Sequence, residues 1–88
     1  MYLHLGQNVV VPEKDVIGIF DLDNTTGSHI TRKFLSDAEK AGRVINVSDE
    51  LPRSFVVSSN NNDITVYLSL LSPQTLLKRS GALNLSGF

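Results

Sequence analysis

The stretch ITRKFLSDAEKAG, residues 30–42, decides the fold class of this chain. Its apolar residues are Ile30, Phe34, Leu35, Ala38 and Ala41. All but Leu35 recur at spacings of four, four and three, which places them on one stripe of a helix. The charged residues between them face away from this stripe. The sequence therefore predicts one long amphipathic helix, which ends at Gly42 because glycine readily adopts the left-handed conformation.

Short β-strands are predicted on both sides of this helix. The expected strands cover residues 2–5, 8–11 and 15–20 before it, and 44–47, 55–58 and 64–70 after it. The last of them alternates apolar and polar residues, as a half-buried strand does. Residues 59–62 form a Ser-Asn cluster that predicts a turn, since Asn tolerates positive φ. Ser72 and Pro73 predict the start of a short C-terminal helix, with Ser as the N-cap and Pro at the first helical position.

These elements indicate a single α+β domain built around a small antiparallel sheet. Short hairpin connections cannot join parallel neighbours, which need a longer crossover. The 88 residues fit one domain, which we place at residues 1–80. Residues 81–88 show no periodicity, and we expect a loose C-terminal tail there.

Composition excludes several classes of protein. The chain has no cysteine, its formal net charge is −1, and no apolar run approaches the roughly 20 residues that span a bilayer. We therefore expect a cytoplasmic protein without a membrane segment. A chain this short buries only about two-thirds of its unfolded surface. Together with the apolar strand segments 9–11 and 55–57, this predicts that the protein forms a homo-oligomer, with a closed ring covering its sheet edges.

The stretch IFDLDNTT, residues 19–26, places Asp21, Asp23 and Thr25 directly after an apolar run. This spacing resembles the start of the active site in haloacid-dehalogenase-type phosphatases. Such an enzyme needs a doubly wound parallel sheet, a later Lys and a second acidic pair for magnesium. The chain is too short for that core, so we interpret the segment as an acidic strand-to-helix turn. We expect no enzyme activity, no cofactor and no metal site, and His4 and His29 have no ligand spacing.

The basic residues are the remaining functional clue. They are Lys14, Arg32, Lys33, Lys40, Arg43, Arg53, Lys78 and Arg79. Lys14 and Arg53 lie in predicted loops that precede strands, and loops at one end of a sheet can present cations together to a phosphate backbone. The others lie mainly on predicted helices, where solvated positions are the usual interpretation. Single loop cations are usually solvated surface, so the residues alone leave two interpretations open: a small cytoplasmic α+β domain with solvated loop cations, or one that binds an anionic partner through these loops.

The order of segments along the whole chain resembles the RemA/RemB family of bacterial extracellular matrix regulators. The segments that carry the resemblance are YLHLGQNVVVPEKDVIGIFDLDNTT (2–26), ITRKFL (30–35), AEKAGRVINVSDELPRSFVV (38–57) and LSPQTLLKRS (71–80). The resemblance implies a LytTR-like fold, assembly into closed rings and binding of promoter DNA through arginines in two loops.

The two loops of the resemblance depart from the family pattern in this sequence. In the first, residues 12–15, the matching position is acidic and Lys14 stands beside it. In the second, residues 49–53, Leu51 and Pro52 replace an arginine pair and Arg53 remains. Two functions stay open. The protein is either a DNA-binding regulator acting through Lys14 and Arg53, or an oligomeric interaction module of the same family that acts through a protein partner.

Overall fold

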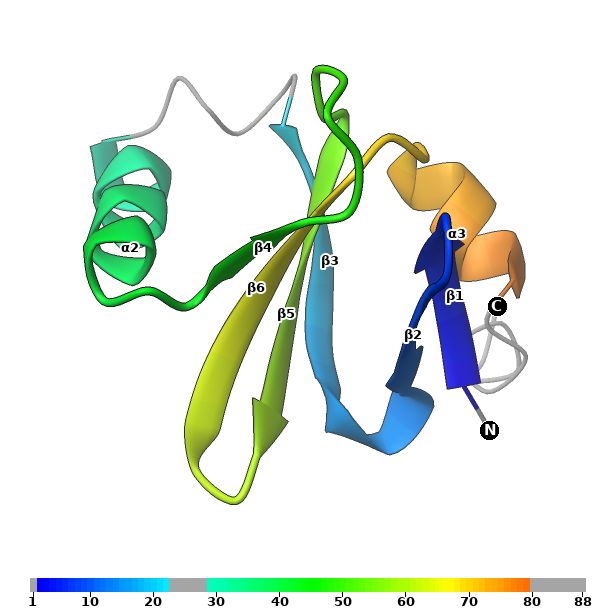
Figure 1. Ribbon diagram of the computed structural model, residues 1–88, viewed down its shortest axis with the longest axis horizontal. Coiled ribbons are helices and arrows are strands. Elements are labelled where there is room, and N and C mark those ends of the chain that lie inside the picture. Colours follow the sequence, from blue (N-terminus) through cyan, green and yellow to red (C-terminus); the bar gives the residue numbers. More distant parts are fainter. Residues whose placement is uncertain (1, 23–28, 80–88) are drawn as a thin grey trace.

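The computed structural model describes residues 2–22 and 29–79 and has an α+β architecture (Figure 1). The strands are β1 (Tyr2–Gly6), β2 (Val9–Pro12), β3 (Val16–Asp21), β4 (Val44–Asn46), β5 (Ser54–Asn60) and β6 (Asp63–Ser69). The helices are the 3₁₀ turn η1 (Glu13–Asp15), α2 (His29–Lys40) and α3 (Pro73–Arg79). The predicted α+β class is thus confirmed. The expected tail at residues 81–88 and the positions of Asp23 and Thr25 lie outside the described residues.

The expected purely antiparallel sheet is wrong at one strand. β1 and β2 form a two-stranded antiparallel sheet, and the other strands form a second sheet in the order β3-β5-β6-β4. In this second sheet β4 runs parallel to β6, whereas the other neighbours are antiparallel. The expectation assumed that strands adjacent in the sequence also pair. Residues 47–53 instead carry the chain past β6 to β5, so that β6 lies between β4 and β5.

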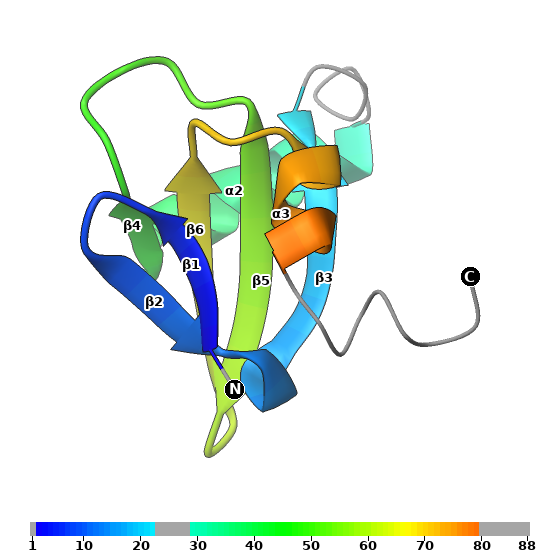
Figure 2. The same ribbon diagram turned by 90° about the vertical axis from the view of Figure 1, so that its right-hand side faces the viewer.

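The four-stranded sheet is covered on both faces. Figure 1 shows α2 on one side, and Figure 2 shows β1, β2 and α3 on the other, with α2 behind the sheet. Two apolar clusters fill the spaces between these layers. The buried residues under the β1–β2 sheet and α3 are Leu3, Leu5, Val11, Val47, Val56 and Leu76. Those between the sheet and α2 are Ala38, Phe55, Val57 and Val66. Most of the strand residues that predicted self-association therefore lie in the core of one subunit.

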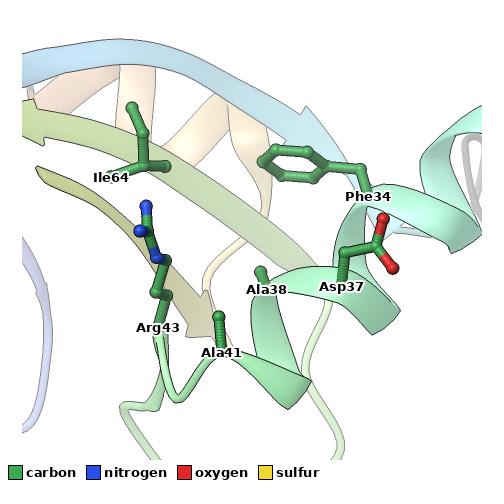
Figure 3. Close-up of a pocket in the computed structure, with 6 residues that line it drawn as sticks. All are labelled: Phe34, Asp37, Ala38, Ala41, Arg43 and Ile64. Atoms are coloured by element: carbon green, nitrogen blue, oxygen red, sulfur yellow. The ribbon is translucent and has the colours of Figure 1, made fainter. Parts of the chain in front are cut away.

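The apolar stripe of α2 is only partly covered by the sheet. Ala38 is buried and Leu35 is half-buried, but Phe34 and Ala41 are exposed. Among the strands, the helix makes its main contacts with β4 and β6. Figure 3 shows Phe34 and Ala41 beside a hollow of about 260 Å³, with the guanidinium of Arg43 directed toward Ile64. The stripe predicted as a core face is thus partly an outer surface.

Buried serines connect the layers. Ser69 Oγ donates a hydrogen bond of 2.7 Å to the carbonyl oxygen of Leu5, which joins β6 to β1. Ser54 Oγ donates a bond of 2.7 Å to the carbonyl oxygen of Leu71. Both serines have no exposed surface. Each buried hydroxyl thereby has a hydrogen-bond partner, which stabilises the contact between the segments that it joins.

The turns follow the predicted residue types. Gly42 has φ +73°, and the N–H of Arg43 donates to the carbonyl of Ala38 at 2.9 Å, which is a Schellman end for α2. Asn61 and Asn62 also have positive φ and close a tight hairpin between β5 and β6. At the start of α3, Ser72 Oγ accepts a hydrogen bond of 3.2 Å from the N–H of Thr75. The predicted helix stop, turn and N-cap are all confirmed.

Replacing Gly42 with alanine should lower the free energy of unfolding by about 1–2 kcal/mol, because left-handed backbone is costly for a residue with a Cβ. A Cβ at this position would meet no atom within 4 Å, so the backbone is the sole source of the cost. Urea unfolding of the two proteins at equal concentration measures the difference. Gly42→Asn is the matched control and should cost less, since asparagine tolerates positive φ. An unchanged midpoint for Gly42→Ala would contradict the prediction.

Candidate nucleic-acid interface

Lys14 lies in η1, the short turn that joins β2 to β3. The turn follows Pro12, the last residue of β2, and Asp15 holds it to the β5–β6 hairpin. The side-chain amide of Asn60 donates a hydrogen bond of 3.1 Å to Asp15 Oδ2. Lys14 itself is exposed, and no carboxylate of the described residues lies within ion-pair distance of its Nζ. The turn therefore presents this ammonium group to solvent from a tethered backbone.

Arg53 is the residue before β5, and its backbone is held on two sides. Its N–H donates a hydrogen bond of 2.8 Å to the carbonyl of Ser69, and its carbonyl accepts one of 3.0 Å from the N–H of Leu22. The side chain is exposed. As with Lys14, the described part of the chain places no carboxylate at ion-pair distance. A guanidinium on a fixed backbone can bind a phosphate group with little loss of backbone entropy.

Lys14 and Arg53 do not lie together, which corrects the expectation that their loops meet at one end of the sheet. β3 and β5 are antiparallel, with Val16 opposite Ser58 and Asp21 opposite Ser54. The residues that precede two antiparallel strands are at opposite ends. The length of β3 separates them by about 17 Å, at roughly 3.3 Å per residue. One subunit therefore offers two separate cationic positions.

Residues 47–53, here called the β4–β5 loop, also carry acidic and apolar groups. Val47 anchors the loop, because its side chain is buried and its N–H donates to the carbonyl of Leu68 at 3.0 Å. Asp49 and Glu50 are exposed, and Leu51 next to them has 87% of its surface exposed. The loop thus presents two carboxylates and a free leucine beside Arg53.

Two of the remaining basic residues, Lys33 and Arg79, make local contacts. Lys33 Nζ lies 3.2 Å from Asp37 Oδ2, one helical turn away on an exposed face of α2. Arg79 Nη1 lies 3.5 Å from His4 Nδ1, and His4 Nε2 donates to the carbonyl of Gln7 at 2.9 Å. His4 is thus a hydrogen-bonded surface residue, as expected.

Of the acidic motif at residues 19–26, the structure describes residues 19–22, and the sheet that carries them is not of the phosphatase type. Asp21 ends β3, and this strand lies in a mixed sheet rather than a doubly wound parallel one. In residues 2–22 and 29–79, no group of three or more His, Asp or Glu side chains is arranged to hold a metal ion. Within the same residues, no helix is long and apolar enough to cross a membrane.

Comparison with known proteins identifies the family to which this chain belongs. Residues 2–79 match the family model described as "RemA-like: Extracellular matrix regulatory protein A-like". The chain belongs to this family. It is also 38% identical over 80 residues to extracellular matrix regulatory protein B of Bacillus subtilis (strain 168), covering 91% of this chain and 90% of that protein. The resemblance to RemB-type regulators is thereby confirmed, and the family is one of regulatory proteins rather than enzymes.

Proposed function

We propose that this protein is a homo-oligomeric regulator of extracellular matrix genes that binds double-stranded DNA through Arg53 and Lys14. The observation that supports it most directly is two exposed cations on tethered backbone, with no carboxylate of the described residues at ion-pair distance, in a family of matrix regulators. The protein acts in the cytoplasm, where promoter DNA is accessible. The LytTR-like mode of binding that the resemblance implies stays a prediction.

The separation of the two cations means that binding depends on several subunits. Each neutralised phosphate contributes about −0.9 to the slope of log K against log salt concentration. One subunit with only two cations therefore has too few phosphate contacts to bind DNA tightly near physiological salt. A closed ring repeats Arg53 and Lys14 around its circumference. DNA that contacts successive subunits gains affinity through effective concentration. Because phosphates are the main contact, binding depends strongly on salt and weakly on base sequence.

Arg53→Ala and Lys14→Ala should each weaken binding of a promoter duplex and make the salt slope less steep, while the oligomer keeps its size. Each contacting subunit loses one phosphate contact, so the affinity should fall by roughly three- to tenfold at moderate salt. Fluorescence anisotropy with a labelled duplex at several salt concentrations measures both quantities, and light scattering measures the oligomer. Lys40→Ala, an exposed lysine at the end of α2, is the matched control and should bind like the parent.

A protein partner is the second candidate function, and Leu51 is the observation that favours it. A leucine with 87% of its surface exposed, next to Asp49 and Glu50, is suited to contact an apolar and basic protein surface. In that case no duplex binds even at low salt, or the Arg53 and Lys14 variants bind DNA like the parent. Either result would contradict the DNA proposal and leave the protein-partner function.

A further inference from the structure

Arg79 is an exposed cation that is held in position by a neutral side chain. Its Nη1 donates a hydrogen bond of 3.5 Å to His4 Nδ1. The other ring nitrogen of His4, Nε2, donates to the carbonyl oxygen of Gln7 at 2.9 Å. A guanidinium can only donate and a carbonyl oxygen can only accept, so the imidazole uses one nitrogen as acceptor and the other as donor, which is its neutral form. His4 therefore orients the guanidinium and leaves its positive charge uncompensated.

Lys33 on α2 shows the opposite arrangement. Its ammonium group lies 3.2 Å from Asp37 Oδ2, so a carboxylate balances its charge. For Arg79, no carboxylate of the described residues lies at ion-pair distance. The contact with His4 occupies one of the five N–H groups of the guanidinium, so the side chain keeps donors for a two-pronged contact with an oxyanion.

The elements around Arg79 carry no acidic residue. β1, β2 and α3 contain no Asp or Glu, whereas α3 ends with Lys78 and Arg79. Asp37 and Glu39 lie on α2, which covers the opposite face of the four-stranded sheet (Figure 2). The layer that β1, β2 and α3 form is therefore positively charged, although the chain has a net charge of −1. Such a layer is suited to bind an anionic partner.

Lys14 lies at the end of the same layer. Tyr2 and His4 share the outward face of β1, since Leu3 between them is buried. Tyr2 pairs with Pro12, and η1 with Lys14 follows directly, so that η1 lies next to the start of β1 (Figure 2). Two residues of strand and one step across the ladder separate His4 from η1, which places Lys14 about 10–15 Å from His4.

We propose that Arg79, positioned by His4, contacts a DNA phosphate beside the phosphate that Lys14 of the same subunit contacts. The inference rests on the proposed DNA binding and adds a contact to it. Two cations about 10–15 Å apart can bind phosphates of one strand, because these recur at about 3.4 Å of rise along the helix axis. Tyr2 lies between the two cations with 67% of its surface exposed, and its hydroxyl is a further donor to the same backbone. His4 is a positioning residue, since it acts through the guanidinium.

Arg79→Ala should weaken binding of the promoter duplex by roughly three- to tenfold at moderate salt and make the salt slope less steep by about 0.9 for each contacting subunit. Fluorescence anisotropy across salt concentrations, in a buffer above neutral pH, measures both quantities. Arg32→Ala is the matched control and should bind like the parent, because Arg32 is an exposed arginine on α2, on the opposite face of the sheet. Circular dichroism checks that the variants are folded, and Arg79→Gln repeats the test with a polar, uncharged side chain.

His4→Phe tests the positioning role. The phenyl ring cannot accept a hydrogen bond from Arg79, so the affinity should fall by about two- to threefold, less than in Arg79→Ala. In the Arg79→Ala background the same change should have no further effect on affinity, because no guanidinium is left to position. His4→Gln retains an acceptor and should recover part of the lost affinity.

The outcomes separate this inference from the proposed function. If Arg79→Ala binds like the parent while Lys14→Ala and Arg53→Ala bind more weakly, the inference is overturned and the proposed function stands. Weaker binding by Arg79→Ala with an unchanged salt slope would overturn the phosphate contact. Equal effects of His4→Phe with and without Arg79 would overturn the positioning by His4. A parent that binds no duplex would overturn the proposed function and this inference with it.

Discussion

Replacing Leu76 with alanine should lower the free energy of unfolding by about 2–5 kcal/mol, the range for a fully buried leucine. Leu76 has no exposed surface and is the buried residue of α3. It belongs to the cluster that also contains Leu3, Leu5 and Val56. Its loss leaves a cavity between α3 and the sheet, and such a short helix has too little intrinsic stability to stay ordered without packing.

The neighbouring Leu77 provides the matched control for this prediction. It lies on the same helix, but 39% of its surface is exposed. Leu77→Ala should therefore cost less than about 1 kcal/mol, since little apolar area leaves the core. Urea unfolding at one fixed protein concentration measures both variants, because the stability of an oligomer depends on concentration. Equal losses for the two leucines would show that α3 is not held by Leu76.

The local structure of this chain could be predicted from the sequence because local chemistry decides it. The end of α2 at Gly42 and the start of α3 at Ser72 both depend on one residue with a specific backbone or side-chain role. The hairpin turn at Asn61 and Asn62 depends on residues that tolerate positive φ. Each of these local structures is determined by residues that are close together in the sequence.

The arrangement of the strands could not be predicted in the same way. The parallel pairing of β4 with β6 is a long-range choice, because Val44 lies opposite Val66, which is 22 residues further along the chain. Long-range strand pairing also explains why the expectation that Lys14 and Arg53 lie together was wrong. Both precede strands, but only the pairing of β3 with β5 shows that they lie at opposite ends of the sheet. The family could be recognised from the segments in order, independently of topology.

Three apolar residues that are exposed where β3 meets α2 had a signal in the sequence, but periodicity did not separate them from the core. Ile17 and Phe20 belong to an apolar strand, and Phe34 belongs to the apolar stripe of α2. Residues in such patterns usually belong to the core. What distinguishes them is the position of α2 over β4 and β6, which leaves the β3 side uncovered. Exposure of this kind depends on packing between elements and has no local cause.

Neutralising the acidic residues of the β4–β5 loop should strengthen DNA binding. Asp49 and Glu50 are exposed and lie in the same loop as Arg53, so they repel the phosphates that Arg53 attracts. Each repulsion is small, a few tenths of a kcal/mol across about 8 Å of water at moderate salt. Repeated in several contacting subunits, the Asp49→Asn and Glu50→Gln double variant should bind roughly tenfold more tightly.

Anisotropy titrations of this double variant across salt concentrations test the idea through a specific signature. Removing repulsion should raise the affinity most at low salt, where screening is weakest, and the gain should shrink as salt rises. Adding Arg53→Ala to the double variant should remove much of the gain, since the phosphate contact itself is lost. Asp37→Asn, an exposed carboxylate on α2 that belongs to neither the β4–β5 loop nor the turn of Lys14, is the matched control and should leave affinity unchanged. A double variant that binds no better than the parent at any salt concentration would show that the DNA does not approach this loop.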